Sequence, residues 1–465
     1  MLNQVSNAST KVTVIGAGLS GLSAAYRLFE KGFDVDVYEA RPRVGGRVHS
    51  VLIKNLDGEY SVAELGGQNF ADGGNADYLL NLAKELGITV EDKYKNLTMV
   101  YYNGKQFLDR RKLTEEAASR IRSTDLDKLI EQTQSIHEVL DILFPARFGV
   151  YDDIKAMLAS LLTAYEGSPP ALLSTHHNGD TLKYMLMGAL SAEHSASTIR
   201  RLYLKDGNAL LPLKLAEKLE GRVHLSKVLD RVSFVEGDKI ALKFKDGTEI
   251  QTDKLVLSIP ASVYKDIAFE DDVITSGQLN DIKSVQYGRN AKVLVPIRYK
   301  SEQFNCVVTN QAVAAFNDDG KLLIFYFTND DGSNSFKQHL YAETLPVFQQ
   351  GLNDAIIFKA QPVDAIEEQL GLYEAPVAKS WVNDAFSRGS YSNYGLSLGA
   401  RFEAVVDHHG FKVKEIFRPI GNSIYFAGEH TTILNAIGTM EAAVESGERI
   451  AAIISSALST EEFGI

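Results

Sequence analysis

A glycine-rich hexapeptide, GAGLSG at Gly16–Gly21, constrains the fold of this chain more than any other feature of its sequence. The apolar segment before it, residues 11–15, is predicted to be a buried strand, and residues 20–31 after it have the apolar spacing of a helix. A second predicted strand at 33–38 leads to Glu39. Strand, glycine turn, helix, strand and acid in this order are typical of a dinucleotide-binding fold.

Each part of this unit has a physical role in holding a pyrophosphate. Gly16 permits the tight turn, Gly18 lets the main chain approach the phosphates, and Gly21 allows the helix to pack closely on the strand. The N-terminus of the helix offers free N–H groups and the positive end of its dipole. The carboxylate of Glu39 can accept hydrogen bonds from a ribose. A purely structural turn is the alternative, and the order of the elements favours the dinucleotide.

The segment RPRVGGR, residues 41–47, favours FAD over NAD as the dinucleotide. Arg43 and Arg47 flank the adjacent Gly45 and Gly46, so fixed positive charge lies beside main chain that a ligand can approach closely. This combination suits a pyrophosphate that the first glycine turn already holds. A basic surface loop, the alternative, does not need two glycines between its arginines.

The nucleotide-binding signals occur in three separated pieces of the chain. Residues 112–201 have mainly helical apolar spacing, and a second sheet is predicted mainly after residue 265. A discontinuous nucleotide domain is therefore expected to alternate with a second domain built from the intervening segments. The predicted strands span residues 223–225, 228–234, 240–244, 254–259, 292–297, 322–328 and 423–427, and a predicted helix spans 439–458.

Composition narrows the class of protein. A formal net charge of −12 argues against nucleic acid as a partner, because a phosphate backbone requires a basic surface. A single cysteine, Cys306, excludes a disulfide within one chain and a cysteine-based metal site. Residues 1–10 lack the apolar core of a signal peptide, and residues 450–458 are too few to span a bilayer. We expect a soluble cytoplasmic protein without a metal, with His176 and His177 in the helical region.

Further motifs follow the glycine turn in order along nearly the whole chain. They are Gly45-Gly46-Arg47, ELGG at 64–67, Val228 and Lys292 within strands, Trp381, GSY at 389–391, FAGE at 426–429 and GTME at 438–441. With these motifs the sequence resembles the flavin-containing amine oxidases, a family that includes monoamine, polyamine and L-amino-acid oxidases. The motifs are specific as a set rather than singly.

The resemblance implies an α/β fold with two interleaved domains. One is an FAD-binding Rossmann-like domain of the glutathione-reductase type, and the other is an α+β substrate domain with a mixed sheet and a helical insert. We predict the FAD-binding domain at 1–75, 205–265 and 415–465, and the substrate domain at 76–204 and 266–414, with the helical insert at about 112–201.

The resemblance also assigns roles along the cofactor. Glu39 would hold the adenosine ribose, Arg47 the phosphates and Glu429 the ribityl or phosphate region, while the main chain of Val228 would contact adenine. The N–H of Met440, at a helix start, would meet the flavin C2 carbonyl, where negative charge develops on reduction. The predicted cofactor-binding residues are Gly16, Gly18, Leu19, Ser20, Gly21, Glu39, Ala40, Arg41, Gly45, Gly46, Arg47, Leu65, Gly66, Gly67, Gln68, Val228, Trp381, Gly428, Glu429, Thr439 and Met440.

Two residues outside the nucleotide motifs carry the chemistry that the resemblance implies. Lys292 stands where the family has a buried lysine, hydrogen-bonded to a water near flavin N5, and it is the predicted catalytic residue. Tyr391 matches an aromatic wall that orients the amine nitrogen. The implied reaction oxidises an amine to an imine, which water hydrolyses to a carbonyl compound plus ammonia or an amine, while O2 is reduced to H2O2.

The sequence departs from the family pattern at several positions. Ser390 replaces the cysteine that bonds the flavin in monoamine oxidases, so FAD is expected to be held non-covalently. Thr439 replaces the second wall tyrosine, so a two-tyrosine cage is not supported. Gln68 and Asn69 stand where L-amino-acid oxidases place an arginine for the substrate carboxylate. The residues predicted to bind the substrate are Gln68, Asn69, Tyr391 and Thr439.

Other functions stay open at this point. A flavin desaturase or porphyrinogen-type oxidase shares the nucleotide motifs but oxidises C–C or ring bonds, and Lys292 with Tyr391 favours the amine oxidase over it. An L-amino-acid oxidase would need an arginine from elsewhere, such as Arg388. A non-catalytic flavoprotein is a further class. The expected partners are a small amine and molecular oxygen, and a homodimer is compatible with the sequence.

Overall fold

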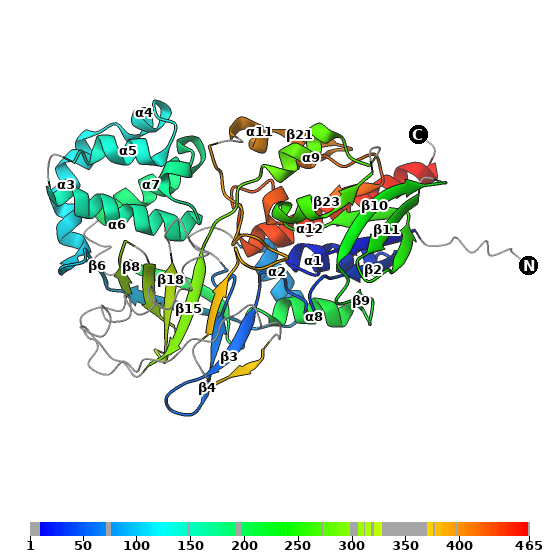
Figure 1. Cartoon of the computed structure of the whole chain (residues 1–465), viewed down its shortest axis with the longest axis horizontal. Coiled ribbons are helices and arrows are strands. Elements are labelled where there is room, and N and C mark those ends of the chain that lie inside the picture. The colour runs from blue at the N-terminus through cyan, green and yellow to red at the C-terminus, as the bar shows by residue number, and fades with distance from the viewer. Residues whose placement is uncertain are drawn as a thin grey trace, which may run out of the picture.

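The computed structural model describes the chain from residue 10 to residue 463. Helices from residues 110–190 gather at one end of the molecule, while the first and last helices lie together at the other end (Figure 1). Within this span the description leaves out residues 71–75, 147–148, 191–196, 238, 271–272, 298–305, 311, 318–319, 328–369, 375–376 and 397–398.

A five-stranded parallel sheet carries the glycine turn at the carboxyl end of β1. In the order β23-β13-β1-β2-β9, every neighbouring pair of strands is parallel. The predicted strands are confirmed here to within two residues at each end, and they come from three separated parts of the chain. They are β1 (Lys11–Ile15), β2 (Asp34–Tyr38), β9 (Val223–His224), β13 (Lys254–Leu257) and β23 (Ile424–Phe426).

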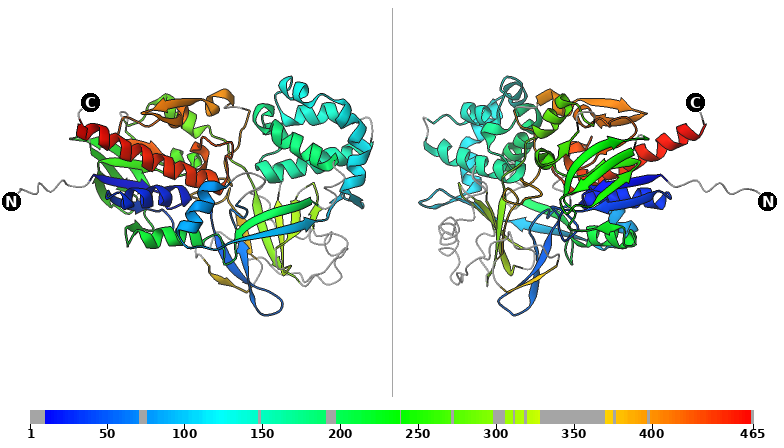
Figure 2. Two further views of the ribbon diagram at one scale, coloured as in Figure 1. Left: turned by 180° about the vertical axis from the view of Figure 1, so that it is seen from behind. Right: turned by 45° about the vertical axis from the view of Figure 1, so that its right-hand side comes forward.

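The first and last helices of the described chain pack side by side and share one apolar core with β1 and β2 (Figures 1 and 2). A Cβ atom on Gly447 would lie 2.3 Å from the main-chain oxygen of Ser20, so only glycine allows the two helices to approach this closely. The predicted helices at 20–31 and 439–458 are confirmed as α1 (Leu19–Glu30) and α12 (Met440–Phe463). The same core includes apolar residues of α2 (Asp77–Glu85) and α8 (Leu210–Lys218).

A mixed seven-stranded sheet, in the order β20-β15-β18-β17-β16-β6-β7, lies in the other part of the molecule. The predicted strands at 292–297 and 322–328 are confirmed as β15 (Ala291–Pro296) and β18 (Leu322–Phe327), with Thr328 outside the described residues. Most of the sheet comes from after residue 265, as predicted, but two strands at one edge come from before it. The other strands are β6 (Met99–Tyr102), β7 (Phe107–Asp109), β16 (Cys306–Val308), β17 (Ala312–Phe316) and β20 (Val377–Ser380).

The helical insert packs against β6, β16 and β17 of this sheet. Its helices are α3 (Arg110–Ser123), α4 (Leu126–Glu131), α5 (Ile136–Leu143), α6 (Gly149–Glu166) and α7 (Thr175–Leu190). The prediction of helix up to residue 201 is wrong at its end, because β8 (Ser197–Leu204) pairs antiparallel with β5 (Val90–Leu97). Thr198, Ile199 and Tyr203 are β-branched or aromatic and favour a strand there.

Besides the β5–β8 pair, the described residues form three further small sheets and several short helices. The predicted strands at 228–234 and 240–244 are confirmed as β10 (Leu229–Val235) and β11 (Lys239–Phe244), but Val228 lies one residue before its strand. The others are β3 (Ser50–Lys54), β4 (Tyr60–Glu64), β12 (Glu249–Thr252), β14 (Ala268–Phe269), β19 (Leu372–Tyr373), β21 (Val405–His408), β22 (Phe411–Lys414), α9 (Ser276–Lys283), α11 (Gly399–Glu403) and the 3-10 turns η1 (Pro170–Leu172), η3 (Ala261–Asp266), η5 (Glu415–Phe417) and η6 (Glu429–Thr431).

Contacts cross the predicted domain limits. β3, from the segment predicted to belong to the FAD-binding domain, pairs with β19 from the predicted substrate domain. The apolar side of α2, predicted to lie in the substrate domain, packs into the core of the nucleotide sheet. The exact limits therefore remain a prediction. Among the helices of the described residues, none combines the length and the apolar character needed to cross a membrane.

Candidate active site

One cavity of about 850 Å³ joins the nucleotide sheet to the seven-stranded sheet. Its volume lies in the range of about 300–1,000 Å³ that is usual for small-molecule sites. With one exception, every residue predicted to bind cofactor or substrate lines it. The exception is Gly21, whose predicted role is packing. The fold therefore brings together motifs that are far apart along the chain.

Of the three glycines of the turn, Gly18 has free space beside its Cα, whereas Gly16 and Gly21 have close neighbours there. A Cβ on Gly18 would meet nothing within 4 Å, so the main chain there is accessible to a ligand. A Cβ on Gly21, in contrast, would lie 2.1 Å from the main-chain oxygen of Gly16 and 2.2 Å from Ser258 Oγ. Gly16 itself has φ of +106°, a conformation that disfavours other residues. One glycine thus leaves room for phosphate, and the others allow the turn and the helix packing.

The second glycine pair packs on the first turn. The N–H of Gly45 donates to the main-chain oxygen of Ala17 over 2.7 Å, and a Cβ on Gly46 would lie 3.4 Å from the Cα of Gly18. The carboxylate of Glu39 is buried and accepts from the N–H of Ala17 at 2.7 Å. The two turns and the end of β2 therefore form one continuous main-chain surface on the cavity.

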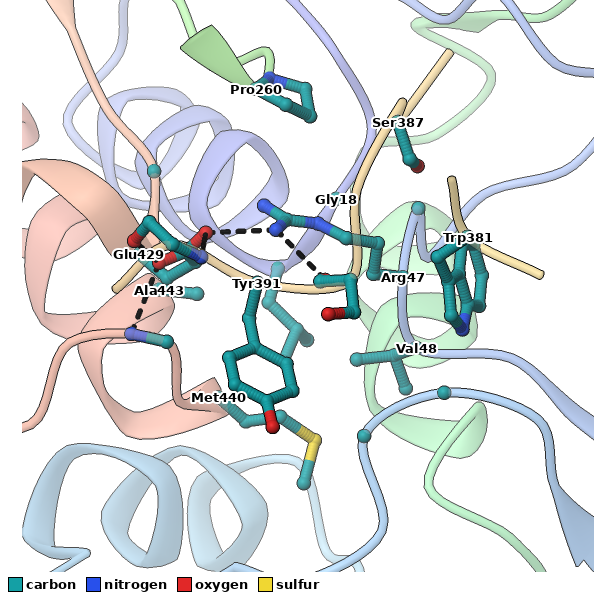
Figure 3. Close-up of a pocket in the computed structure, with 18 of the residues that line it drawn as sticks. Gly18, Arg47, Val48, Pro260, Trp381, Ser387, Tyr391, Glu429, Met440 and Ala443 are labelled. Carbon is teal, nitrogen blue, oxygen red and sulfur yellow. Dashed lines mark hydrogen bonds and ion pairs between the residues drawn. The ribbon is translucent and has the colours of Figure 1, made fainter. Parts of the chain in front are cut away.

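The half-buried Arg47 and the buried Glu429 form an ion pair in the cavity wall (Figure 3). Arg47 Nη1 donates to Glu429 Oε1 at 2.8 Å and to the main-chain oxygen of Ser390 at 3.1 Å. Glu429 also accepts from the N–H groups of Ser392 at 3.2 Å and Gly438 at 3.0 Å. Burial alone would raise the pKa of Glu429, but the Arg47 charge and the side-chain hydrogen bonds from Ser392 and Arg47 hold it below its ordinary value. Arg47 therefore orders Glu429 as well as facing the cavity.

A second buried ionic cluster holds Trp381 in the cavity wall. Arg41 Nη2 and Lys379 Nζ both contact the Asp384 carboxylate, the lysine at 2.7 Å. Lys379 Nζ lies 4.5 Å from the centroid of the Trp381 ring, and the indole N–H donates to the main-chain oxygen of Leu65 at 3.0 Å. Lys379 and Asp384 could not be predicted from the sequence, since nothing in their local sequence indicates the ion pair with Arg41.

Lys292 is buried on β15 and reaches the segment predicted to border the flavin. Its Nζ donates to the main-chain oxygens of Gly66 at 2.8 Å and Glu64 at 3.1 Å, and to Gln68 Oε1 at 3.3 Å. Burial raises the pKa of the Glu64 carboxyl to about 7, although hydrogen bonds from Asn208 and Ser50 act to lower it. The predicted catalytic lysine and the predicted flavin-bordering glycines are thus in direct contact.

Asn208, which the sequence analysis did not single out, holds this segment from the other side. Its Nδ2 donates to the main-chain oxygens of Gly67 at 3.0 Å and Gln68 at 2.9 Å. Its own N–H donates to Glu64 Oε1 at 2.8 Å. The side chain is buried, so these bonds are shielded from water. Asn208 and Lys292 together fix the main chain of the Glu64–Gln68 segment.

Tyr391 and Thr439, both predicted to bind the substrate, line the cavity from different elements. The hydroxyl of Tyr391 contacts the main-chain oxygens of Ala164 at 3.0 Å and Tyr165 at 2.9 Å, at the end of α6. Thr439 lines the cavity, but its Oγ1 accepts from the N–H of Ala442 at 3.1 Å and so caps α12. Tyr326 of β18, missed from the sequence, contacts the Tyr391 hydroxyl at 3.2 Å.

The remaining candidates have defined positions. Ser390 Oγ donates to Asn290 Oδ1 at 2.8 Å in the cavity wall, whereas Cys306 is buried in β16 away from it. Arg388 lines the cavity and pairs with Asp266 at 2.8 Å. His176 and His177 lie in α7, within the predicted helical region, and both contact Glu403.

The cavity fits an extended dinucleotide. At one end lie Glu39 and Val228, beside the carboxyl ends of the parallel strands, where such folds bind nucleotides. Gly18 leaves the middle open to a pyrophosphate, next to the N-terminus of α1. Gly66 and Gly67, predicted to border the flavin, also line the cavity, beside Lys292. The donors, acceptors and open main chain that such a ligand needs therefore line one cavity.

Known proteins are similar to this chain over most of its length. A lysine-specific histone demethylase 1 homolog 2 from Arabidopsis thaliana is 25% identical over 472 residues, covering 95% of this chain and 58% of that protein. An L-amino-acid oxidase from Mus musculus is 25% identical over 478 residues, covering 95% of this chain and 70% of that protein. The chain spans little more than half the length of the first relatives that it matches, 58% and 52%.

Solved structures share the fold over nearly the whole chain. Cyclohexylamine oxidase from Brevibacterium oxydans IH-35A superposes with a TM-score of 0.72 at 16% identity, covering 97% of this chain and all (100%) of that one. Putrescine oxidase bound to putrescine gives a TM-score of 0.68 at 20% identity, covering 96% and 99% of the two chains. The sequence profile described as flavin containing amine oxidoreductase matches residues 19–455. The chain therefore belongs to the flavin-containing amine oxidoreductase family.

Proposed function

We propose that this protein is an FAD-dependent amine oxidase. The observation that carries the proposal is the contact of the buried Lys292 with Gly66 and Gln68, in the cavity that also contains the nucleotide turn and Tyr391. When bound, FAD supplies a two-electron acceptor that takes the α-hydrogen of an amine as a hydride equivalent and passes the electrons to O2, giving H2O2. The substrate leaves as an imine, and water hydrolyses it to a carbonyl compound plus ammonia or an amine.

The residues of the chain bind, orient and shield in this proposal. Gly18, Glu39 and the main chain beside Val228 would hold the nucleotide end, and the Arg47–Glu429 pair the ribityl and phosphate region. Lys292 would position a water or handle a proton beside the amine carbon, and Tyr391 would orient the amine nitrogen. Ser390 offers no thiol for a covalent flavin bond, so we propose that FAD is held non-covalently.

A panel of substrates under two conditions tests the proposal. The purified protein should be yellow, release FAD into the supernatant on acid denaturation, and produce H2O2 with at least one amine in air. Without oxygen, the same amine should bleach the flavin absorbance. A protein that holds flavin but is bleached by no monoamine, polyamine or amino acid would contradict the proposal.

The panel also separates the competing enzyme classes. An L-amino-acid oxidase should be bleached by amino acids and not by the amines that lack the carboxylate. In the cavity, Arg388 is already paired with Asp266, which favours amines without a carboxylate. A desaturase or porphyrinogen-type oxidase should respond to neither group of compounds. The proposed acceptor is tested by comparing reoxidation by O2 with reoxidation by quinones.

A further inference from the structure

Tyr326 lies directly opposite Lys292 across two antiparallel strands. The register of β15 and β18 pairs Lys292 with Tyr326, and the register of β17 and β18 pairs Tyr326 with Val313. Side chains directly opposite each other share one face of a sheet. All three residues line the cavity. One row across the sheet therefore presents a lysine, a tyrosine and an apolar side chain to the same space.

The hydrogen bonds of the two tyrosines have a fixed direction. The Tyr391 hydroxyl lies within 3.0 Å of the main-chain oxygens of Ala164 and Tyr165 and 3.2 Å from the Tyr326 hydroxyl. Carbonyl oxygens only accept, so Tyr391 donates to the end of α6 and Tyr326 donates to Tyr391. This chain of bonds fixes both rings against the helical insert.

The ring face of Tyr326 is turned toward the proposed reaction centre. Lys292 Nζ lies 5.7 Å from the centroid of the Tyr326 ring, within the range of a cation–π contact. A protonated amine is attracted to the same ring face, and the N–H groups of an amine in either protonation state can donate to phenol oxygens. Thr439, which contributes no ring, is engaged as the cap of α12. Tyr326 is therefore the aromatic residue whose hydroxyl partners Tyr391 beside Lys292.

The next row of the sheet is apolar. Ala315 pairs with Ile324 across β17 and β18, and both line the cavity. The partly exposed positions of these two strands all line the cavity, and they are Val313, Ala315, Ile324 and Tyr326. The surface beside the tyrosine pair therefore favours carbon groups rather than a second charge.

We infer that Tyr326 and Tyr391 together hold the amine nitrogen of the substrate beside Lys292, and that the substrate carries this nitrogen on an apolar body that packs on Val313, Ala315 and Ile324. The inference rests on the proposed function and adds a positioning residue and a substrate class to it. Tyr326 acts at the nitrogen, and the apolar row acts on the rest of the molecule.

Single-turnover kinetics with Tyr326→Phe test the first half. The variant keeps the ring and loses one hydrogen bond, so flavin reduction by an amine should slow about three- to tenfold, by a similar factor for alkylamines of different length. Tyr326→Leu, which loses the ring as well, should be slower still. Tyr102→Phe on β6 of the same sheet, outside the cavity, is the matched control and should leave the rate unchanged. The visible spectrum of the resting flavin should be the same in all variants.

Several outcomes would overturn this half of the inference, and they differ from failure of the proposed function. If no amine reduces the wild-type flavin, the proposed function fails. If amines reduce it and Tyr326→Phe reacts at the wild-type rate, Tyr326 is not a positioning residue. If Tyr326→Phe alters the resting spectrum as much as the rate, the residue acts through the flavin site and the assignment to the amine nitrogen is wrong.

A homologous series of linear amines tests the substrate class. If the body packs on the apolar row, kcat/KM should rise about fourfold for each added methylene until the cavity is filled. Ile324→Asn should flatten this dependence, because the asparagine amide replaces apolar surface beside the added methylenes. A flat series in the wild type would overturn the inference. So would a preference for the diamine over the monoamine of equal length, which would instead assign the distal ammonium to Glu166 of the cavity wall.

Discussion

Lys292 connects two parts of the molecule through three oxygen atoms. Its Nζ leaves the cavity face of β15 and reaches Gly66 and Gln68, which lie on the segment that Asn208 holds from behind. Through these hydrogen bonds, the position of the seven-stranded sheet determines the position of the main chain along the proposed flavin site. Its removal should therefore affect reaction rates more than cofactor retention.

Lys292→Met tests this role directly. The variant should keep bound FAD, because the nucleotide contacts lie at the other end of the cavity. Reduction by the amine or reoxidation by O2 should slow about 100-fold, the size of a general acid–base contribution. Stopped-flow spectroscopy of each half-reaction measures both rates. Lys243→Met, an exposed lysine on β11, is the control. Unchanged rates in both half-reactions would remove Lys292 from the mechanism.

Glu39→Ala should weaken FAD binding and lower stability. The carboxylate accepts from the N–H groups of Ala17 at 2.7 Å and Arg41 at 2.9 Å, and alanine leaves these buried donors without it. The free energy of unfolding should fall by about 2–3 kcal/mol, and the FAD dissociation constant should rise at least about tenfold. Urea denaturation and dialysis followed by absorbance measure the two effects. Full FAD occupancy after dialysis would contradict the assigned role.

At the scale of elements, the nucleotide unit was predictable because its signals are local. Strand, turn and helix between Lys11 and Glu30 depend on neighbours in sequence. The hairpin of β6 and β7 was missed although Asn103-Gly104 is a strong turn signal. Tyr326 and Asn208 could not be found in this way, because their roles arise from strand register and from contacts between distant segments.

The turn between β1 and α1 gives a paired prediction. The Cβ added by Gly18→Ala would meet no neighbouring atom, and residue 18 has φ of −75°, which alanine adopts readily. The free energy of unfolding of the apoprotein should therefore change by no more than about 1 kcal/mol. The added methyl group occupies the path of the pyrophosphate, so FAD binding should weaken. Gly21→Ala should lower the free energy of unfolding of the apoprotein several times more than Gly18→Ala does, because its Cβ would lie 2.1 Å from the Gly16 oxygen. Apoprotein thermal melts and FAD titrations distinguish the two; equal effects would contradict the division of roles.

The loop that carries Trp381 should respond to acid. Burial alone would raise the pKa of Asp384, but the charges of Arg41 and Lys379 lower it from 3.8 to about 2. Because the pKa is depressed in the folded state, the stabilisation is complete above pH 3.8 and is lost as the pH falls toward 2.

Asp384→Asn should therefore lower the free energy of unfolding by at least about 2 kcal/mol at pH 6. The difference from wild type should shrink as the pH falls toward 2. Urea denaturation at several pH values measures it, with Asp206→Asn, an exposed aspartate, as the control. A difference that does not change with pH would show that the effect comes from packing rather than from charge.

At the scale of the whole molecule, the cavity is the junction between the two sheets. A ligand that fills it binds the folded chain and not the unfolded one, so it stabilises by mass action. Free FAD at 100 times its dissociation constant should raise the apparent free energy of unfolding by about 3 kcal/mol. Denaturation at a series of FAD concentrations measures this, with NAD as the control ligand. An effect of equal size from NAD would contradict the assignment of the dinucleotide.

Because the segment after β23 and the start of α12 complete a cavity that β1 and α1 begin, the order of synthesis limits when a cofactor can be captured. A ribosome must translate the whole interval between Ile15 and Ile424 before Glu429 and Met440 emerge. At about 5–20 residues per second, that interval takes roughly 20 to 80 s. During this time the nascent glycine turn lacks its partner surface, so the holoprotein can form only near the end of translation or after it.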